Sequence, residues 1–209
     1  MCLDRKFNIL LTSIMKKTFP LLIILAAIGA PLLQAEVQSF SMIWNAPLCT
    51  PSCAAQLTQR LSHNTPGVQK AEVSQAAGRA DVVWDPRVPF SFQPINNSVR
   101  YVGIRPRLFR IRVRGTVQDV NGRNFTLIST GDNTPFVLRG PIQPSLNRYT
   151  EQYNPQSHFL NPQLIQQLSN IARARQTVVI EGPFFEPFRS PPNQLIIETL
   201  SVEEEKKRP

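Results

Sequence analysis

The sequence predicts an α+β protein in two parts, a β-α-β-β-α-β unit at residues 36–107 and a five-stranded β-barrel with one helix at residues 108–203. Short segments in which apolar and polar residues alternate predict the strands. Apolar residues at helical spacing predict the helices, and clusters of Asn, Gly and Pro mark the turns between these segments. The order of the segments along the chain therefore sets the fold class.

The beginning of the chain has the three parts of a secretory signal peptide in the usual order. The charged pair Lys16 and Lys17 precedes an apolar stretch and then a series of small residues, with cleavage expected after Ala35. The apolar stretch is short for a membrane span, which needs roughly 20 residues. Translation is expected to start at Met15. Residues 1–35 are thus predicted to be removed, leaving a periplasmic or secreted protein that is not integral to the membrane.

The charge of the remaining chain is positive and comes mostly from arginine. The whole sequence has a formal net charge of +9, and the first 35 residues hold four basic residues and one acidic residue. In an exported protein, such a charge favours an anionic membrane surface, an envelope polymer or another protein as partner over nucleic acid. The tail at 204–209 has mixed charge and is predicted to be disordered.

The sequence lacks the residue combinations that are typical of enzyme active sites. Its two histidines cannot complete a Ser-His-Asp triad with the residues around them, and no phosphate-binding loop or His-rich metal cluster is present. We therefore expect a binding protein and not an enzyme.

The first predicted helix begins at a pair of cysteines. A strand at 38–44 leads into the segment Cys49-Thr50-Pro51-Ser52-Cys53, where Thr50 can cap the helix and Pro51 suits its first position. Leu57 and Leu61 follow at helical spacing, and the segment 64–67 ends the helix.

The remaining elements of this part complete a split ferredoxin-like unit. The segments 68–75 and 80–84 form a hairpin across a turn with Gly78. A second helix is expected over 91–101, and a last strand begins near Ile104.

These residues resemble the heavy-metal-associated domain found in copper chaperones, metal-pumping ATPases and periplasmic mercury-binding proteins. The family's usual motif is Cys-x-x-Cys after a Met, whereas this chain has Cys-x-x-x-Cys and Pro47 at the Met position. The resemblance implies that Cys49 and Cys53 bind a soft metal ion. It spans about 65 residues and rests on the cysteine pair, Leu57, Leu61, Pro66-Gly67-Val68, the segment 80–86 and Gly103.

The cysteine pair has three chemical interpretations. Two thiolates near a helix start could bind Cu(I) or Hg(II), and less readily Zn(II), which usually takes four ligands. In an oxidising compartment Cys49 and Cys53 could instead form a structural or redox-labile disulfide. Thiol exchange is the third possibility. His63, near the far end of the helix, is expected at the surface, and His158 belongs to the other part.

The second part has the element order of an OB-fold barrel. Strands at 109–120, 124–130 and 136–139 precede a helix at 162–174, and strands at 177–184 and 194–202 follow it. A glycine inside the long first strand, Gly115, suits a sharp bend.

Barrels of this kind bind ligands through the second and third strands and the neighbouring loops. The candidate binding residues here are Phe136 and Arg139, together with Phe125 and the loop at 184–193, and Tyr149 and Tyr153 could lie over them. The alternative is that Phe125 and Leu127 fill the barrel core.

An arginine row is the last candidate site. Arg110, Arg112 and Arg114 share one face of the first barrel strand, while Ile111 and Val113 face the other way. Such a row could bind phosphate or carboxylate groups, or it could be the solvated face of a strand.

Two functions remain open. The protein could sequester or deliver a soft metal ion, or it could be an envelope interaction module in which the barrel binds a protein or an oligomer and the cysteines form a disulfide.

Overall fold

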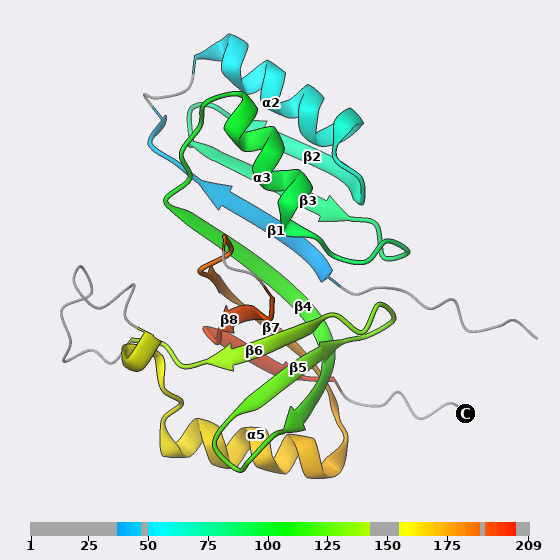
Figure 1. The fold of residues 1–209 in the computed structure, drawn as a ribbon, viewed down its shortest axis with the longest axis vertical. Coiled ribbons are helices and arrows are strands. Elements are labelled where there is room, and N and C mark those ends of the chain that lie inside the picture. The colour runs from blue at the N-terminus through cyan, green and yellow to red at the C-terminus, as the bar shows by residue number, and fades with distance from the viewer. Residues whose placement is uncertain (1–36, 47–49, 143–154, 189–190, 204–209) are drawn as a thin grey trace, which may run out of the picture. The chain divides into compact units, whose positions relative to one another are not determined.

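The computed structural model describes residues 37–46, 50–142, 155–188 and 191–203 (Figure 1). All of them lie in one compact unit. None of the described helices is long and apolar enough to pass through a membrane. The fold is α+β with a closed five-stranded barrel, which confirms the predicted fold class at that level.

The N-terminal part consists of four strands and two helices. Its strands lie in the order β2-β3-β1-β4, with every neighbouring pair antiparallel. The helices bury Leu57 and Leu61 from the first and Ile95 and Val99 from the second. The elements are β1 (Val37–Ile43), α2 (Pro51–Asn64), β2 (Val68–Ser74), β3 (Arg79–Trp84), α3 (Phe92–Tyr101) and β4 (Leu108–Asp119).

Helix α2 starts as its sequence predicts. The Thr50 hydroxyl accepts a hydrogen bond from the backbone N–H of Cys53 at 3.3 Å, and Pro51 occupies the first helical turn. These contacts satisfy a backbone donor that the first turn would otherwise leave without a partner.

Strand β4 belongs to both parts of the molecule (Figure 1). Its residues 108–113 pair with β1, and residues 115–119 pair with β5 (Phe125–Ser129). Along its other edge, residues 110–116 pair with β7 (Thr177–Phe185). The boundary predicted after residue 107 therefore falls at the start of a strand that both parts share.

Gly115 lies where β4 changes partner from β1 to β5. A Cβ atom at this position would stand 2.2 Å from the backbone oxygen of Ile128. Only glycine permits this close approach between the two strands.

The barrel closes through a parallel pair of strands. Its ring runs β4-β5-β6-β8-β7 and returns to β4, with β6 and β8 parallel and the other pairs antiparallel. The remaining elements are β6 (Pro135–Arg139), the short 3-10 helix η2 (Pro155–His158), α5 (Pro162–Ala174), β8 (Asn193–Ile196) and β9 (Thr199–Val202).

The last predicted strand, at 194–202, is two strands in the structure. Both β8 and β9 pair with the same edge of β7, and they are interrupted opposite Gly182 and Pro183. Pro183 has no N–H to donate to a strand ladder. Between the two strands, the N–H of Ile197 bonds to Arg139 O at 2.9 Å and that of Glu198 to Glu181 O at 3.1 Å.

The hydrophobic interior is continuous between the two parts. Phe40 and Trp84 from the N-terminal part and Phe125, Leu127 and Ile180 from the barrel belong to one cluster of buried residues. The prediction that Phe125 and Leu127 fill the barrel core is confirmed, because both are fully buried.

We expect Gly67→Ala to destabilise the N-terminal part strongly. Gly67 has φ +86°, and a Cβ atom there would lie 2.2 Å from the indole ring of Trp84. The matched control is Gly103→Ala, because Gly103 has φ +73° but a Cβ atom added there would meet no atom within 4 Å. Gly103→Ala should cost about 1 kcal/mol from backbone strain alone.

Gly67→Ala should cost at least about 1 kcal/mol more than this control, since overpacking adds to the strain. Urea unfolding followed by tryptophan fluorescence measures both free energies. Equal losses in the two variants would contradict the packing of Trp84 on Gly67.

Candidate functional site

The arginine row on β4 is matched by carboxylates from other strands. Arg112 donates to the side-chain oxygen of Gln38 at 2.8 Å and lies 3.3 Å from a carboxylate oxygen of Glu181. Arg110 forms ion pairs with Glu181 and Glu198. This face of the sheet therefore carries alternating charges and not a single positive sign.

Arg114 completes the same pattern. Its Nε donates to a carboxylate oxygen of Glu203 at 2.7 Å. Sequence reasoning found the arginines but missed Glu181, Glu198 and Glu203. Glu181 reaches Arg112 through the β4–β7 register, and no local pattern in the sequence predicts this register.

The other barrel residues that were predicted to bind a ligand make contacts within the protein. Phe136 is fully buried, and its ring packs against Phe90 and Phe184 at centroid distances of 6.2 and 6.4 Å. Arg139 donates to the side-chain oxygen of Gln194 at 2.8 Å. Phe136 thus supports the core and does not present a surface, while Tyr149 and Tyr153 lie outside the described residues.

Cys53 occupies the first turn of α2, as predicted. Its side chain is half-buried against the hydrophobic core, and its thiol is free. Cys49, the other member of the predicted pair, lies outside the described residues. Within the ranges that the structure describes, no group of three or more His, Cys, Asp or Glu side chains could hold a metal ion.

The two histidines lie far from this helix start in different environments. His63 is exposed in the last turn of α2, with Nδ1 3.2 Å from Gln59 O. His158 is buried, with Nδ1 3.0 Å from Gly140 O and its ring 4.7 Å from that of Phe185.

A cluster of phenylalanine rings joins the two parts of the molecule. The ring centre of Phe92, at the start of α3, lies 5.0 Å from that of Phe109 in β4 and 5.6 Å from that of Phe184 in β7, in edge-to-face arrangements. Each such pair stabilises the fold by about 0.5–1.5 kcal/mol in addition to the contribution of the apolar area that it buries. Phe90, Phe40 and Phe188 extend the cluster.

The loop before α3 is held in place by several polar contacts, and it carries Phe90 into this cluster. Trp84 Nε1 donates to Val88 O at 2.7 Å, and the N–H of Phe90 donates to a carboxylate oxygen of Asp132 at 3.0 Å. Hydrogen bonds from the side chain and backbone of Arg87 lower the pKa of Asp85 to about 2. This carboxylate is therefore ionised at neutral pH and can keep its contacts with Arg87.

A cavity of about 480 Å³ opens beside the phenylalanine cluster. It lies between the start of β4 on one side and the end of β7 with the residues after it on the other, and its lining is mostly aromatic, aliphatic and proline side chains. Among the described residues, three polar ones, Arg107, His158 and Glu186, interrupt this lining. The apolar lining residues include Phe109, Phe184, Phe185, Phe188, Ile142, Ile196, Pro106, Pro183 and Pro187.

Phe188 forms the rim of this cavity. Its side chain is two-thirds exposed, yet its ring packs on Phe92 at 5.5 Å and Phe109 at 5.8 Å. Glu186, two residues earlier, adopts φ +45°, a backbone conformation that residues other than glycine rarely take. A large apolar ring is thus exposed beside the cavity.

No protein-family model matches this sequence, and neither does any curated protein or any solved structure. The function must therefore be inferred from the residues themselves.

Proposed function

We propose that this chain is an exported binding protein without catalytic activity, and that the cavity beside the barrel holds the apolar side chains of an acidic segment of an envelope protein. The observation that carries this proposal is the apolar cavity with Phe188 at its rim and Arg107 in its lining. A cavity of this size and composition lies in the usual range for ligand sites, about 300–1,000 Å³.

The topology supports the same location. The strand order β2-β3-β1-β4 with two helices supports the proposal of a ferredoxin-like unit, and the helix between the third and fourth strands of the five-stranded barrel supports that of an OB-fold. OB-folds use the loop between their fourth and fifth strands for binding. In this chain that loop joins β7 to β8 and supplies Phe188.

The apolar lining favours a flat apolar group, and Arg107 favours a negative charge on the part of that group that it contacts. Aromatic rings and prolines bind flat or extended apolar groups without losing much side-chain entropy. The Arg107 guanidinium can pair with a carboxylate at the cavity mouth. A positive net charge would attract such a partner before contact.

We expect the cavity to bind 8-anilinonaphthalene-1-sulfonate, a probe with apolar rings and one anionic group, with an increase in its fluorescence. Arg107→Gln should weaken binding about fivefold, as expected for losing one partly exposed charge contact. Arg105→Gln is the matched control, because Arg105 is also exposed but does not line the cavity.

The role of Phe188 at the rim can be tested with a matched pair of variants. Phe188→Ala should weaken probe binding, whereas Phe159→Ala should not, because Phe159 is 67% exposed against 66% for Phe188 but lies outside the cavity lining. Absence of binding to the wild-type protein would contradict the proposal. So would equal losses in the test and control variants.

A second candidate function is soft-metal binding by Cys49 and Cys53, as the resemblance to heavy-metal-associated domains implies. The observation in its favour is the half-buried Cys53 thiol in the capped first turn of α2. The thiolate is the form of cysteine that coordinates Cu(I) or Hg(II). The bound ion would be cargo that the protein sequesters or delivers.

We expect residues 36–209, reduced and kept anaerobic, to bind one equivalent of Cu(I) in competition with a chromophoric chelator. Cys53→Ser and Cys49→Ser should each abolish this binding, because one thiolate cannot replace the pair. Two thiols that remain titratable after Cu(I) is added would exclude this function. An oxidant-resistant Cys49–Cys53 bridge in protein prepared without reductant would favour the disulfide interpretation instead.

A further inference from the structure

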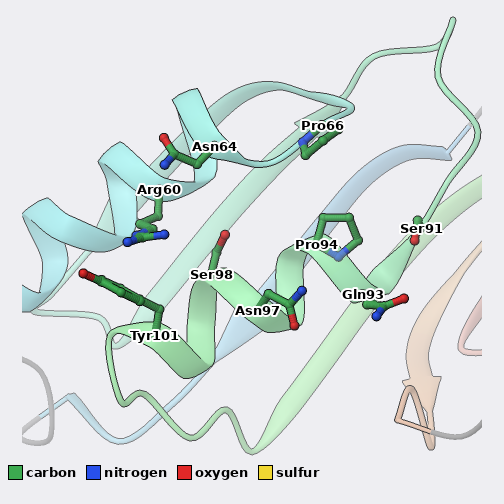
Figure 2. A pocket seen from close by; sticks show the side chains of 9 residues that line it. All are labelled: Arg60, Asn64, Pro66, Ser91, Gln93, Pro94, Asn97, Ser98 and Tyr101. Atoms are coloured by element: carbon green, nitrogen blue, oxygen red, sulfur yellow. The ribbon is translucent and has the colours of Figure 1, made fainter.

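A second hollow, of about 490 Å³, lies between α2 and α3 (Figure 2). It shares no described lining residue with the cavity beside the barrel. Two stripes of polar side chains border it. Arg60 and Asn64 lie one turn apart on α2, and Gln93, Asn97 and Tyr101 follow one another at intervals of four residues along α3.

Ser98, one of the residues that line this groove, takes part in a buried polar contact. The hydroxyls of Ser98 and Thr65 form a buried hydrogen bond of 2.7 Å between α3 and the end of α2. The Thr65 hydroxyl also lies 3.0 Å from Arg60 O. The two helices therefore meet through a polar contact here, where packed helices usually present apolar side chains.

Tyr101 provides an aromatic platform at one end of the groove. The guanidinium carbon of Arg60 lies 3.3 Å from the centre of its ring. This cation–π contact covers one ring face and orients the ring. The Tyr101 residue is nevertheless 65% exposed, so the rest of the ring is open to a ligand.

Three amide side chains offer hydrogen bonds in the same groove. Among the described residues, the side chains of Asn64, Gln93 and Asn97 have no protein hydrogen-bond partner. Each amide has one acceptor oxygen and two donor hydrogens. A hydroxyl group both donates and accepts, so neighbouring hydroxyls on a ring match these amides.

We propose that the groove between α2 and α3 binds a short oligosaccharide. The C–H face of a sugar ring would stack on Tyr101, its hydroxyls would bond to Asn97 and Asn64, and a carboxylate on an acidic sugar would pair with Arg60. Among the lining residues that the structure describes, Arg60 is the one cation and none is acidic, so a polyphosphate fits less well than a neutral or mildly acidic sugar.

The test is a titration with two probes, a trimer of N-acetylglucosamine and a trimer of galacturonate, followed by ¹H–¹⁵N NMR. For whichever trimer binds, Tyr101→Ala should weaken the affinity about tenfold or more, since stacking on the tyrosine ring is lost. Asn97→Ala should weaken it about fivefold. The neighbouring Asn96→Ala is the matched control and should leave binding unchanged, because Asn96 does not line the groove.

Tyr101→Phe should keep most of the affinity, since the ring remains. Far-UV circular dichroism checks that each variant is folded, which the exposure of Tyr101 leads us to expect. Failure of both trimers to bind at millimolar concentration would overturn the proposal. Binding that Asn96→Ala weakens as much as Asn97→Ala, or binding of single-stranded DNA but of neither trimer, would also overturn it. Arg107→Gln should not affect this titration, so the site is tested separately from the cavity.

Discussion

The double pairing of β4 is the constraint on which the rest of the structure depends. One edge of this strand pairs first with β1 and then with β5, while the other edge pairs with β7. Twelve residues therefore provide backbone hydrogen bonds to both parts of the molecule. The change of partner is possible because Gly115 lets the Ile128 carbonyl approach closely.

Both candidate binding features depend on this strand in different ways. Phe109 of β4 meets Phe92 and Phe184 because β4 fixes the N-terminal part and the barrel in register, and the cavity opens beside these rings. The groove between α2 and α3 instead depends on local helix spacing and on the Ser98–Thr65 hydrogen bond. The two features therefore differ in chemistry, one apolar and one polar, and in the part of the fold that forms them.

Local features were predictable from the sequence wherever neighbouring residues decide the structure. Helix α5 begins and ends at the predicted residues. It begins there because Asn161 caps it, accepting a hydrogen bond from Leu164 N at 2.8 Å, and Pro162 suits its first turn. Long-range features were not predictable. Glu181 meets Arg112 only through the register of β4 with β7, two strands about 70 residues apart, and the break opposite Pro183 depends on the pairing of β7 with β8 and β9. The cavity lining likewise comes from segments that only the tertiary fold brings together.

The most direct test of the shared strand is whether the two parts unfold together. Both tryptophans, Trp44 and Trp84, lie in the N-terminal part, so their fluorescence reports its unfolding in urea. Pulse-labelled hydrogen exchange of peptides covering β5 and β6 reports the barrel under the same conditions. A shared β4 predicts one urea midpoint for both signals, and Gly115→Ala should lower both by the same amount. Two separate midpoints, or a Gly115→Ala shift confined to the barrel peptides, would contradict the dependence of both parts on β4.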